Sequence, residues 1–304
     1  MNVIFMGTPE FAVPCLEALI RDGHTVTSVF TQPDKPVGRK QVLTAPPVKQ
    51  LALAHGIPVH QPTSLKNDEV VSLIRAQKPE AIAVTAYGKL LPKAVLDIPR
   101  WGCINVHASL LPAYRGAAPI QWSVINGEPV TGVTTMHMAE GLDTGDMILK
   151  KETPILPDET AGELHDRLKE IGAQALSDTL RLLEQDSAPR TQQDDTLSSY
   201  APMLDKSLAQ VDFSKTAAQV HNLVRGMSPW PVAYTKLDGR MLKLHKTRIL
   251  DQGGEAGTLL SDTQLIIGCG KGAVELLEVQ YEGAKRMSAE LFMRGRRLQK
   301  GTKF

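Results

Sequence analysis

Gly102-Cys-Ile-Asn-Val-His107-Ala-Ser-Leu-Leu-Pro112 is the stretch of this sequence that decides the fold. Its first half is short, apolar and preceded by a glycine, so it predicts a buried strand over residues 103–106. Side chains two positions apart on a strand share a face. Asn105 and His107 therefore project the same way, with Val106 in the opposite layer. They lie at the carboxyl end of a strand, where ligands bind in open α/β sheets.

The segments around this strand alternate between strand and helix patterns. Strands are predicted at residues 2–6, 25–30, 58–60, 81–85, 130–138 and 147–155, and helices at 10–21, 48–55, 68–76 and 160–183. This alternation indicates an α/β fold with a Rossmann-like, mainly parallel sheet and helices on both faces. Gly7 follows the first strand, but the second and third glycines of a dinucleotide-binding G-x-G-x-x-G motif are missing.

The last third of the chain follows a different pattern. Residues 185–205 are polar and predict a linker. Beyond it come a helical segment at 216–225 and short β-rich runs at 232–237, 241–249, 265–268 and 274–279, with glycines between them. This pattern predicts a smaller, OB-like β-barrel. We therefore expect a catalytic domain over 1–187, a linker over 188–205 and a C-terminal domain over 206–304.

The C-terminal domain is basic, although the whole chain has a net charge of +1. Residues 206–304 contain 16 Lys and Arg against 9 Asp and Glu, and the preceding residues contain 18 against 24. Such a split indicates an anionic partner, for which nucleic acid is the usual candidate. A solvated basic surface is the alternative.

The cysteines and apolar runs restrict the class of protein. The 3 cysteines are widely spaced in apolar segments, which predicts neither a disulfide framework nor a metal site. No apolar run approaches the roughly 20 residues of a membrane span, and the start of the chain lacks the basic region of a signal peptide. We expect a cytoplasmic protein with no membrane partner. It should be a monomer, since no heptad run is present.

Several motifs together make the sequence resemble the folate-dependent formyltransferases, and among them the enzymes that act on a charged initiator tRNA. Besides Asn105, His107 and the stretch Gly141-Leu-Asp-Thr-Gly145, the match includes Gly7-Thr-Pro-Glu-Phe-Ala12, Phe30-Thr-Gln-Pro-Asp34, Ala86-Tyr-Gly-Lys-Leu-Leu-Pro92, Arg115-Gly-Ala-Ala-Pro119 and Pro229-Trp-Pro231. These motifs occur in order across nearly the whole chain.

The resemblance implies that Asn105, His107 and Asp143 are catalytic. The implied reaction moves the formyl group of 10-formyltetrahydrofolate to the α-amino group of methionyl initiator tRNA. The Asn105 amide and a protonated His107 can donate to the oxyanion that forms, and Asp143 would favour and orient the charged imidazole. Taken alone, the three residues are also compatible with a core histidine, a backbone-bonding asparagine and a turn aspartate.

The resemblance also implies where the folate and the tRNA bind. Folate is expected on Tyr87, Gly88, Leu90, Ser109, Leu110, Leu111 and Pro112, with the pterin between residues 86–90 and the turn at 139–144, and no metal is implied. Core packing is the alternative for the Leu-Leu-Pro run. For tRNA, the long loop at 34–49 contributes Arg39 and Lys40, although a mobile surface loop is the alternative. Phosphate contacts are expected from Lys206, Arg294, Arg296 and Arg297.

Two other functions remain open at this stage. The same catalytic residues would serve an enzyme that formylates an amino sugar nucleotide or another small amine, which would need neither the basic domain nor the long loop. A non-enzymatic RNA-binding protein with a decayed catalytic domain is the third possibility. The intact Asn105, His107 and Asp143 argue against it.

Overall fold

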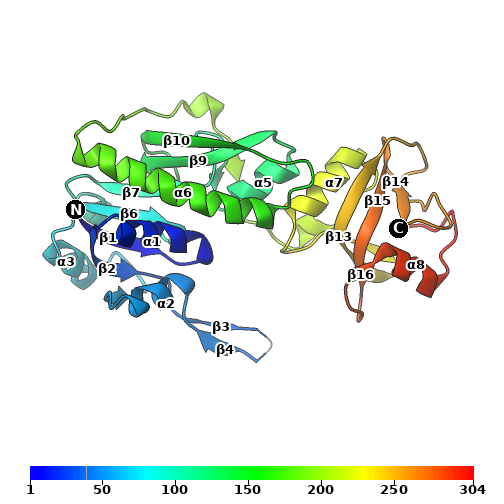
Figure 1. Cartoon of the computed structure of the whole chain (residues 1–304), viewed down its shortest axis with the longest axis horizontal. Coiled ribbons are helices and arrows are strands. Elements are labelled where there is room, and N and C mark those ends of the chain that lie inside the picture. Colours follow the sequence, from blue (N-terminus) through cyan, green and yellow to red (C-terminus); the bar gives the residue numbers. More distant parts are fainter. Residues whose placement is uncertain (39) are drawn as a thin grey trace. The chain divides into compact units, whose positions relative to one another are not determined.

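The computed structural model describes residues 1–38 and 40–304 and divides the chain into two compact units (Figure 1). Unit 1 comprises Met1–Gly116, Thr131–Pro154 and His165–Ala201. Unit 2 comprises Ala117–Val130, Ile155–Leu164 and Pro202–Phe304. Within the described ranges, no helix is both long and apolar enough to cross a membrane.

A seven-stranded sheet forms the centre of unit 1, in the order β10-β9-β7-β6-β1-β2-β5. The strands are β1 (Asn2–Gly7), β2 (Thr25–Phe30), β5 (Val59–His60), β6 (Ala81–Thr85), β7 (Cys103–His107), β9 (Val130–His137) and β10 (Met147–Pro154). All neighbours from β5 to β7 are parallel, and β9 is antiparallel to β7. The predicted Rossmann-like, mainly parallel sheet is therefore confirmed.

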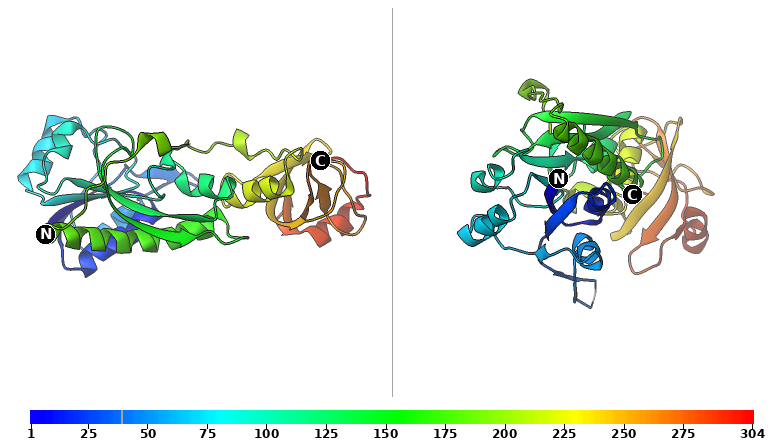
Figure 2. Two further views of the ribbon diagram at one scale, coloured as in Figure 1. Left: turned by 90° about the horizontal axis from the view of Figure 1, so that it is seen from above. Right: turned by 60° about the vertical axis from the view of Figure 1, so that its left-hand side comes forward.

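Helices cover both faces of this sheet. On one face, α1 (Val13–Arg21) lies beside α6 (Ala161–Glu184), where Lys169 pairs with Glu10 and Ser177 donates to Asp22. Figure 2 shows α6 running along the sheet. On the other face, α3 (Asp68–Ala76) and α4 (Lys93–Leu96) share a core cluster with β1, β6 and the start of β7. The remaining helices of unit 1 are α2 (Pro47–Ala54), η1 (Glu10–Ala12) and η2 (Asp195–Leu197).

Two short strand pairs complete unit 1. β3 (Lys35–Val37) and β4 (Val42–Thr44) form an antiparallel hairpin in the segment that the sequence predicts to be a loop. β8 (Arg115–Gly116) pairs in parallel with β11 (Tyr200–Ala201). The polar segment after α6 therefore belongs to unit 1 as far as Ala201, although the sequence suggests a linker there.

Unit 2 is built on an antiparallel sheet of five strands, with the order β12-β13-β15-β14 and β16 beside β15. They are β12 (Tyr234–Leu237), β13 (Arg240–Leu250), β14 (Ile266–Gly268), β15 (Ala273–Tyr281) and β16 (Met287–Ser288). Its helices are α5 (Pro119–Ile125), η3 (Ser207–Ala209), α7 (Ala217–Gly226) and α8 (Ala289–Arg296). The predicted OB-like barrel is not confirmed, because this sheet does not close in the described part of the chain.

Candidate active site

Strand β7 presents alternate residues to the two faces of the sheet. Cys103 belongs to the core cluster beneath α3 and α4, so Asn105 and His107 lie on that same face. Val106 faces α6, since a Cβ at Gly172 would lie 3.1 Å from Val106 Cγ1. Asn105 is half-buried, and its side chain has no hydrogen-bond partner among the described residues. Its amide is therefore available to a ligand.

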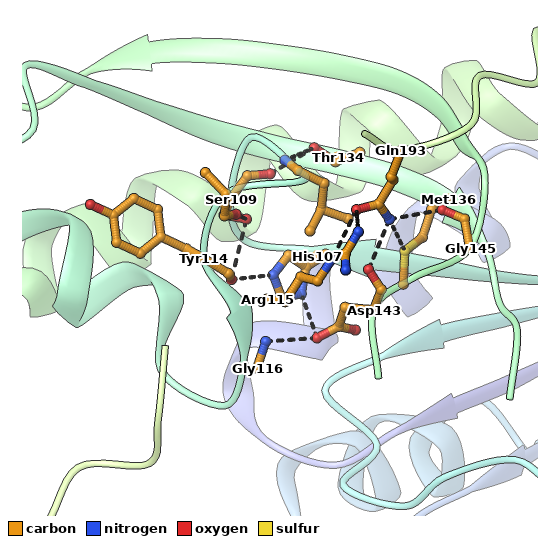
Figure 3. A network of polar contacts seen from close by, with 12 residues as sticks. His107, Ser109, Tyr114, Arg115, Gly116, Thr134, Met136, Asp143, Gly145 and Gln193 are labelled. Carbon is orange, nitrogen blue, oxygen red and sulfur yellow. Dashed lines mark hydrogen bonds and ion pairs between the residues drawn. The ribbon is translucent and has the colours of Figure 1, made fainter. Parts of the chain in front are cut away.

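His107 is buried between two oxygen atoms (Figure 3). Its Nε2 lies 2.9 Å from the carbonyl oxygen of Tyr114, and its Nδ1 lies 3.6 Å from Oδ2 of Asp143. Because a carbonyl oxygen can only accept a hydrogen bond, Nε2 must carry a proton and donate to the Tyr114 carbonyl. The distance between Nδ1 and Oδ2 of Asp143 is longer than that of a hydrogen bond. Nδ1 thus faces the carboxylate and makes no hydrogen bond within the described residues.

Asp143 lies in the connection between β9 and β10, with a left-handed backbone at φ 53°. Its Oδ2 accepts the N–H of Gly116 at 2.9 Å. Gly116 has φ 114°, and a Cβ there would lie 2.7 Å from the carbonyl oxygen of Ala201, so only glycine fits. The structure therefore brings Asp143 next to His107, on the face that Asn105 shares.

Ser109 and Leu111, both predicted to bind folate, are fully buried in the turn that follows β7. Ser109 Oγ donates to the carbonyl oxygen of Ala113 at 2.6 Å, and Thr134 Oγ1 donates to that of Ser109 at 2.7 Å. The N–H of Leu111 donates to Thr134 Oγ1 at 3.0 Å. These contacts shape the turn that presents the Tyr114 carbonyl to His107. The other two predicted residues of this turn, Leu110 and Pro112, are half-buried.

The second segment predicted to bind folate is the loop after β6. The carbonyl oxygen of Tyr87 accepts from Gln32 Nε2 at 2.9 Å and from Thr8 Oγ1 at 3.2 Å. The Tyr87 ring is buried, and its hydroxyl has no hydrogen-bond partner within the described residues. Burial raises the pKa of Tyr87 to about 12, so the hydroxyl stays neutral. Gly88 and Leu90 are exposed.

A cavity of about 590 Å³ borders the first residue of β7. Its lining includes Leu96 and Cys103 from one side and Met138, Ala139 and Glu140 from the connection after β9. Of these, Ala139 and Glu140 belong to the turn at 139–144, against which the pterin is expected. Within the described part of the chain, none of the predicted catalytic or folate-binding side chains lines the cavity itself.

Gln193 is part of this site, although sequence reasoning did not identify it. Its Nε2 donates to the carbonyl oxygens of Asp143 and Gly145, both at 2.8 Å. Its Oε1 accepts from Nε and Nη2 of Arg115 at 3.0 and 2.8 Å. Gln193 is only 7% exposed. The polar composition of residues 188–205 predicts a linker, and composition cannot distinguish one buried glutamine from solvated ones.

The predicted tRNA contacts are spread over both units. Arg39 lies outside the described residues, and its neighbour Lys40 is exposed at the turn between β3 and β4. Lys206 is exposed in unit 2, just before η3. Each of these two lysines can therefore reach a phosphate, but the structure does not bring them together in one unit.

The three predicted arginines of the C-terminal cluster differ in their surroundings. Arg294, on α8, pairs with Glu290 at 2.6 Å, and both side chains are exposed. The guanidinium of Arg296 lies 3.5 Å from the ring centroid of Tyr281, a cation–π contact. Arg297 is exposed and ends α8 in a left-handed conformation. Arg296 is thus held against its own unit, whereas Arg297 faces solvent.

Two family profiles match the chain, one described as formyl transferase over residues 1–180 and one as formyl transferase, C-terminal domain, over residues 203–297. A curated relative from Geobacter metallireducens, named methionyl-tRNA formyltransferase, is 51% identical over 99% of this chain and 97% of its own. A relative of the same name from Geotalea daltonii is 52% identical over 100% and 98%. The chain belongs to the methionyl-tRNA formyltransferase family.

Solved formyltransferases share the fold of this family at lower identity. The sugar 3N-formyl transferase WlaRD, crystallised with dTDP and 5-N-formyl-THF, has a TM-score of 0.70 and 18% identity over 94% of this chain and 99% of that one. An N-formyltransferase from Helicobacter canadensis, in complex with folinic acid and dTDP-3-aminofucose, has a TM-score of 0.69 and 18% identity, over 94% and 100%. These likenesses support the formyltransferase fold described above.

Proposed function

We propose that this enzyme transfers the formyl group of 10-formyltetrahydrofolate to the α-amino group of methionyl initiator tRNA. The observation that carries the proposal is the contact between His107 and Asp143 on the face of β7 that Asn105 shares. The names of relatives that are about half identical over the full chain support the same substrate.

The residues of the site match what formyl transfer requires. When an amine attacks a formyl carbon, the formyl oxygen gains negative charge and needs donors. The amide of Asn105 has no other partner in the described residues, and Nδ1 of His107 can donate once the imidazole is protonated. Donors of this kind contribute about 3 to 4 kcal/mol each to stabilising the transition state. Asp143 lies beside them, and its carboxylate can accept the proton that the amine loses, directly or through water. The same proton can then pass to N10 as the bond between N10 and the formyl carbon breaks, so that tetrahydrofolate leaves as a neutral amine.

The pterin is expected between the loop at residues 86–90 and the turn at 139–144. Gly88 and Leu90 are exposed on the first of these segments, and Ala139 is exposed on the second. The cavity at the first residue of β7 is a poorer candidate for the pterin. It borders the amino end of the strand, and six charged residues line it: Lys93, Asp97, Arg100, Glu140, Asp186 and Arg190.

The C-terminal residues complete the proposal on the acceptor side. We place the catalytic residues of formyl transfer within residues 1–187 and assign tRNA contacts to Lys40, Arg39 and the basic residues of 206–304, above all Lys206 and Arg297. Contacts of this kind position the backbone of a tRNA without reading its sequence. We expect the enzyme to act in the cytoplasm as a monomer, which light scattering after size-exclusion chromatography can check.

The decisive experiment is a formylation assay with 10-formyltetrahydrofolate and three acceptors: methionyl initiator tRNA, free methionine and an amino sugar nucleotide. Rapid formylation of the charged tRNA alone, slowed by added salt, is the expected result. Turnover of the sugar nucleotide instead would keep the chemistry of Asn105, His107 and Asp143 but reject tRNA as the acceptor. Absence of turnover with every acceptor would reject formyl transfer.

A further inference from the structure

The amide of Gln193 can take only one orientation. Two N–H groups of Arg115 donate to its Oε1, so its Nε2 must point away from the guanidinium. In that direction lie the carbonyl oxygens of Asp143 and Gly145, which the amide bridges (Figure 3). The arginine is itself anchored, because its Nη2 also donates to Oδ1 of Asp195 at 2.7 Å.

The loop that Gln193 bridges has an unfavourable backbone conformation. Asp143 is not a glycine, yet its φ is 53°. Such conformations cost on the order of 1 kcal/mol or more and persist only where the surroundings hold them. The two contacts from Gln193 are made to the carbonyls on either side of Thr144, so they hold the part of the loop that aims the Asp143 carboxylate at His107.

Residues near Gln193 hold the other side of the histidine as well. Ser199 Oγ accepts the N–H of Tyr114 at 2.8 Å, and the Ser199 carbonyl accepts that of Arg115 at 2.8 Å. The Tyr114 carbonyl is the group that receives Nε2–H of His107. Both oxygens that flank the imidazole are therefore fixed by the segment 193–199, which lies more than eighty positions beyond β7 in the sequence.

We propose that Gln193 is a positioning residue for formyl transfer, which acts through the backbone of Asp143 and Gly145 and is oriented by Arg115. This inference rests on the proposed function, because it assigns Gln193 a role in that same reaction. Gln193 does not touch the reacting atoms. Its loss should therefore misplace the Asp143 carboxylate and lower kcat, while the predicted tRNA-binding residues of 206–304 stay intact.

The sharpest variant is Gln193→Glu, which keeps the shape and the contact with Arg115 but turns an oxygen toward the two carbonyl oxygens. We expect kcat to fall about 10- to 100-fold, with the KM for tRNA within about twofold of wild type. The matched control is Gln77→Glu. Gln77 is also held by the protein, since its Oε1 accepts from Thr27 and Ser28 at 2.8 and 2.7 Å, but it lies far from the site in the fold. A kcat equal to wild type in Gln193→Glu would overturn the proposal.

A second measurement needs no substrate and therefore separates this inference from the proposed function. In protein with ¹⁵N-labelled histidine, the neutral variant Gln193→Met should move the Nδ1 resonance of His107 in the same direction as Asp143→Asn does, and Gln77→Met should not. If wild type fails to formylate tRNA but this resonance moves, the function is wrong and the positioning role stands. An unmoved resonance would overturn the role. If both Gln193 variants fail to fold, Arg115→Lys is the replacement test. It must show the same loss of kcat, and a normal kcat in this variant would also overturn the positioning role of Gln193.

Discussion

The imidazole of His107 is held by Tyr114 and only approached by Asp143. Its Nε2 donates to the Tyr114 carbonyl at 2.9 Å, whereas its Nδ1 is 3.6 Å from the Asp143 carboxylate. The orientation of the ring therefore does not depend on the carboxylate. We therefore expect a substitution of Asp143 to leave the histidine in place, so that mutation can separate the roles of the two residues.

Asp143→Asn should lower kcat about a hundredfold and leave tRNA affinity unchanged, because the amide oxygen can still accept the N–H of Gly116 but no longer takes a proton. Steady-state kinetics and filter binding measure the two effects. Asp146→Asn, in the same connection and paired with Arg190 at 2.7 Å, is the matched control. Equal losses in both variants would mean that only the stability of the connection matters.

Asn105→Ala should reduce kcat at least about a hundredfold without lowering the thermal unfolding midpoint, since the described residues give its side chain no partner to lose. His107→Ala should reduce kcat at least as much. It should also lower the midpoint, because it leaves the Tyr114 carbonyl without its donor. Turnover close to wild type in both variants would mean that Asn105 and His107 are not catalytic.

Ala139→Trp should raise the KM for the folate donor about tenfold, because Ala139 is exposed on the turn at 139–144, against which the pterin is expected. The KM for tRNA and the unfolding midpoint should stay unchanged. Ala54→Trp, at the exposed end of α2, controls for the added indole. An unaltered KM for the donor would place the pterin elsewhere.

Replacing Arg294, Arg296 and Arg297 by glutamine should weaken tRNA binding. The dependence of log Kd on log salt should flatten by about one unit for each phosphate that the variant no longer binds. Because Arg296 stacks on Tyr281, Arg296→Gln alone should also lower the unfolding midpoint, and Arg297→Gln should not. Arg75→Gln, on α3, is the control for removal of a positive charge. If the salt dependence of tRNA binding equals that of wild type, the three arginines do not contact tRNA.

Because of His221, the free energy of unfolding should decrease in mild acid. Burial lowers the pKa of His221 below its usual 6.5, and the ring contacts Thr247 Oγ1 at 2.8 Å and the Pro157 carbonyl at 3.2 Å. As the pH falls through 6.5, the unfolded chain gains a proton that the folded protein resists, so the free energy of unfolding falls; above 6.5 this effect vanishes. Urea titrations should show a smaller loss between pH 7.5 and 5.5 in His221→Gln, and an unchanged loss in a variant of exposed His55.

The elements with regular periodicity could be predicted from the sequence. The alternation around Asn105 and the leucine stripe of α6 depend only on spacing, so the parallel sheet and the shared face of β7 follow directly. The hairpin of β3 and β4 was missed because each strand has only 3 residues, all exposed, and gives no alternating apolar signal. Closure of the C-terminal sheet depends on pairings between distant strands, which spacing does not encode.

The candidate site was predictable only in part. The Asn-x-His spacing and the Gly-Leu-Asp-Thr-Gly turn identify side chains whose chemistry is visible in their type. Gln193 and Thr134 act instead through backbone groups of other residues, and any sequence contains many such polar side chains. Ser109 and Leu111 match the family motif for folate. Both are buried, and the Ser109 hydroxyl and the Leu111 N–H make hydrogen bonds within the protein, which residue type does not reveal.

The pairing of β8 with β11 has a consequence for how the enzyme is made. A truncated product that ends at residue 187 would contain all three predicted catalytic side chains but none of the groups that Ser199, Tyr200 and Ala201 supply to Tyr114, Arg115 and Gly116. During synthesis on the ribosome, the site can therefore assemble only after about 200 residues have emerged. A nascent chain that has already formed its sheet should still be catalytically silent until that late strand arrives.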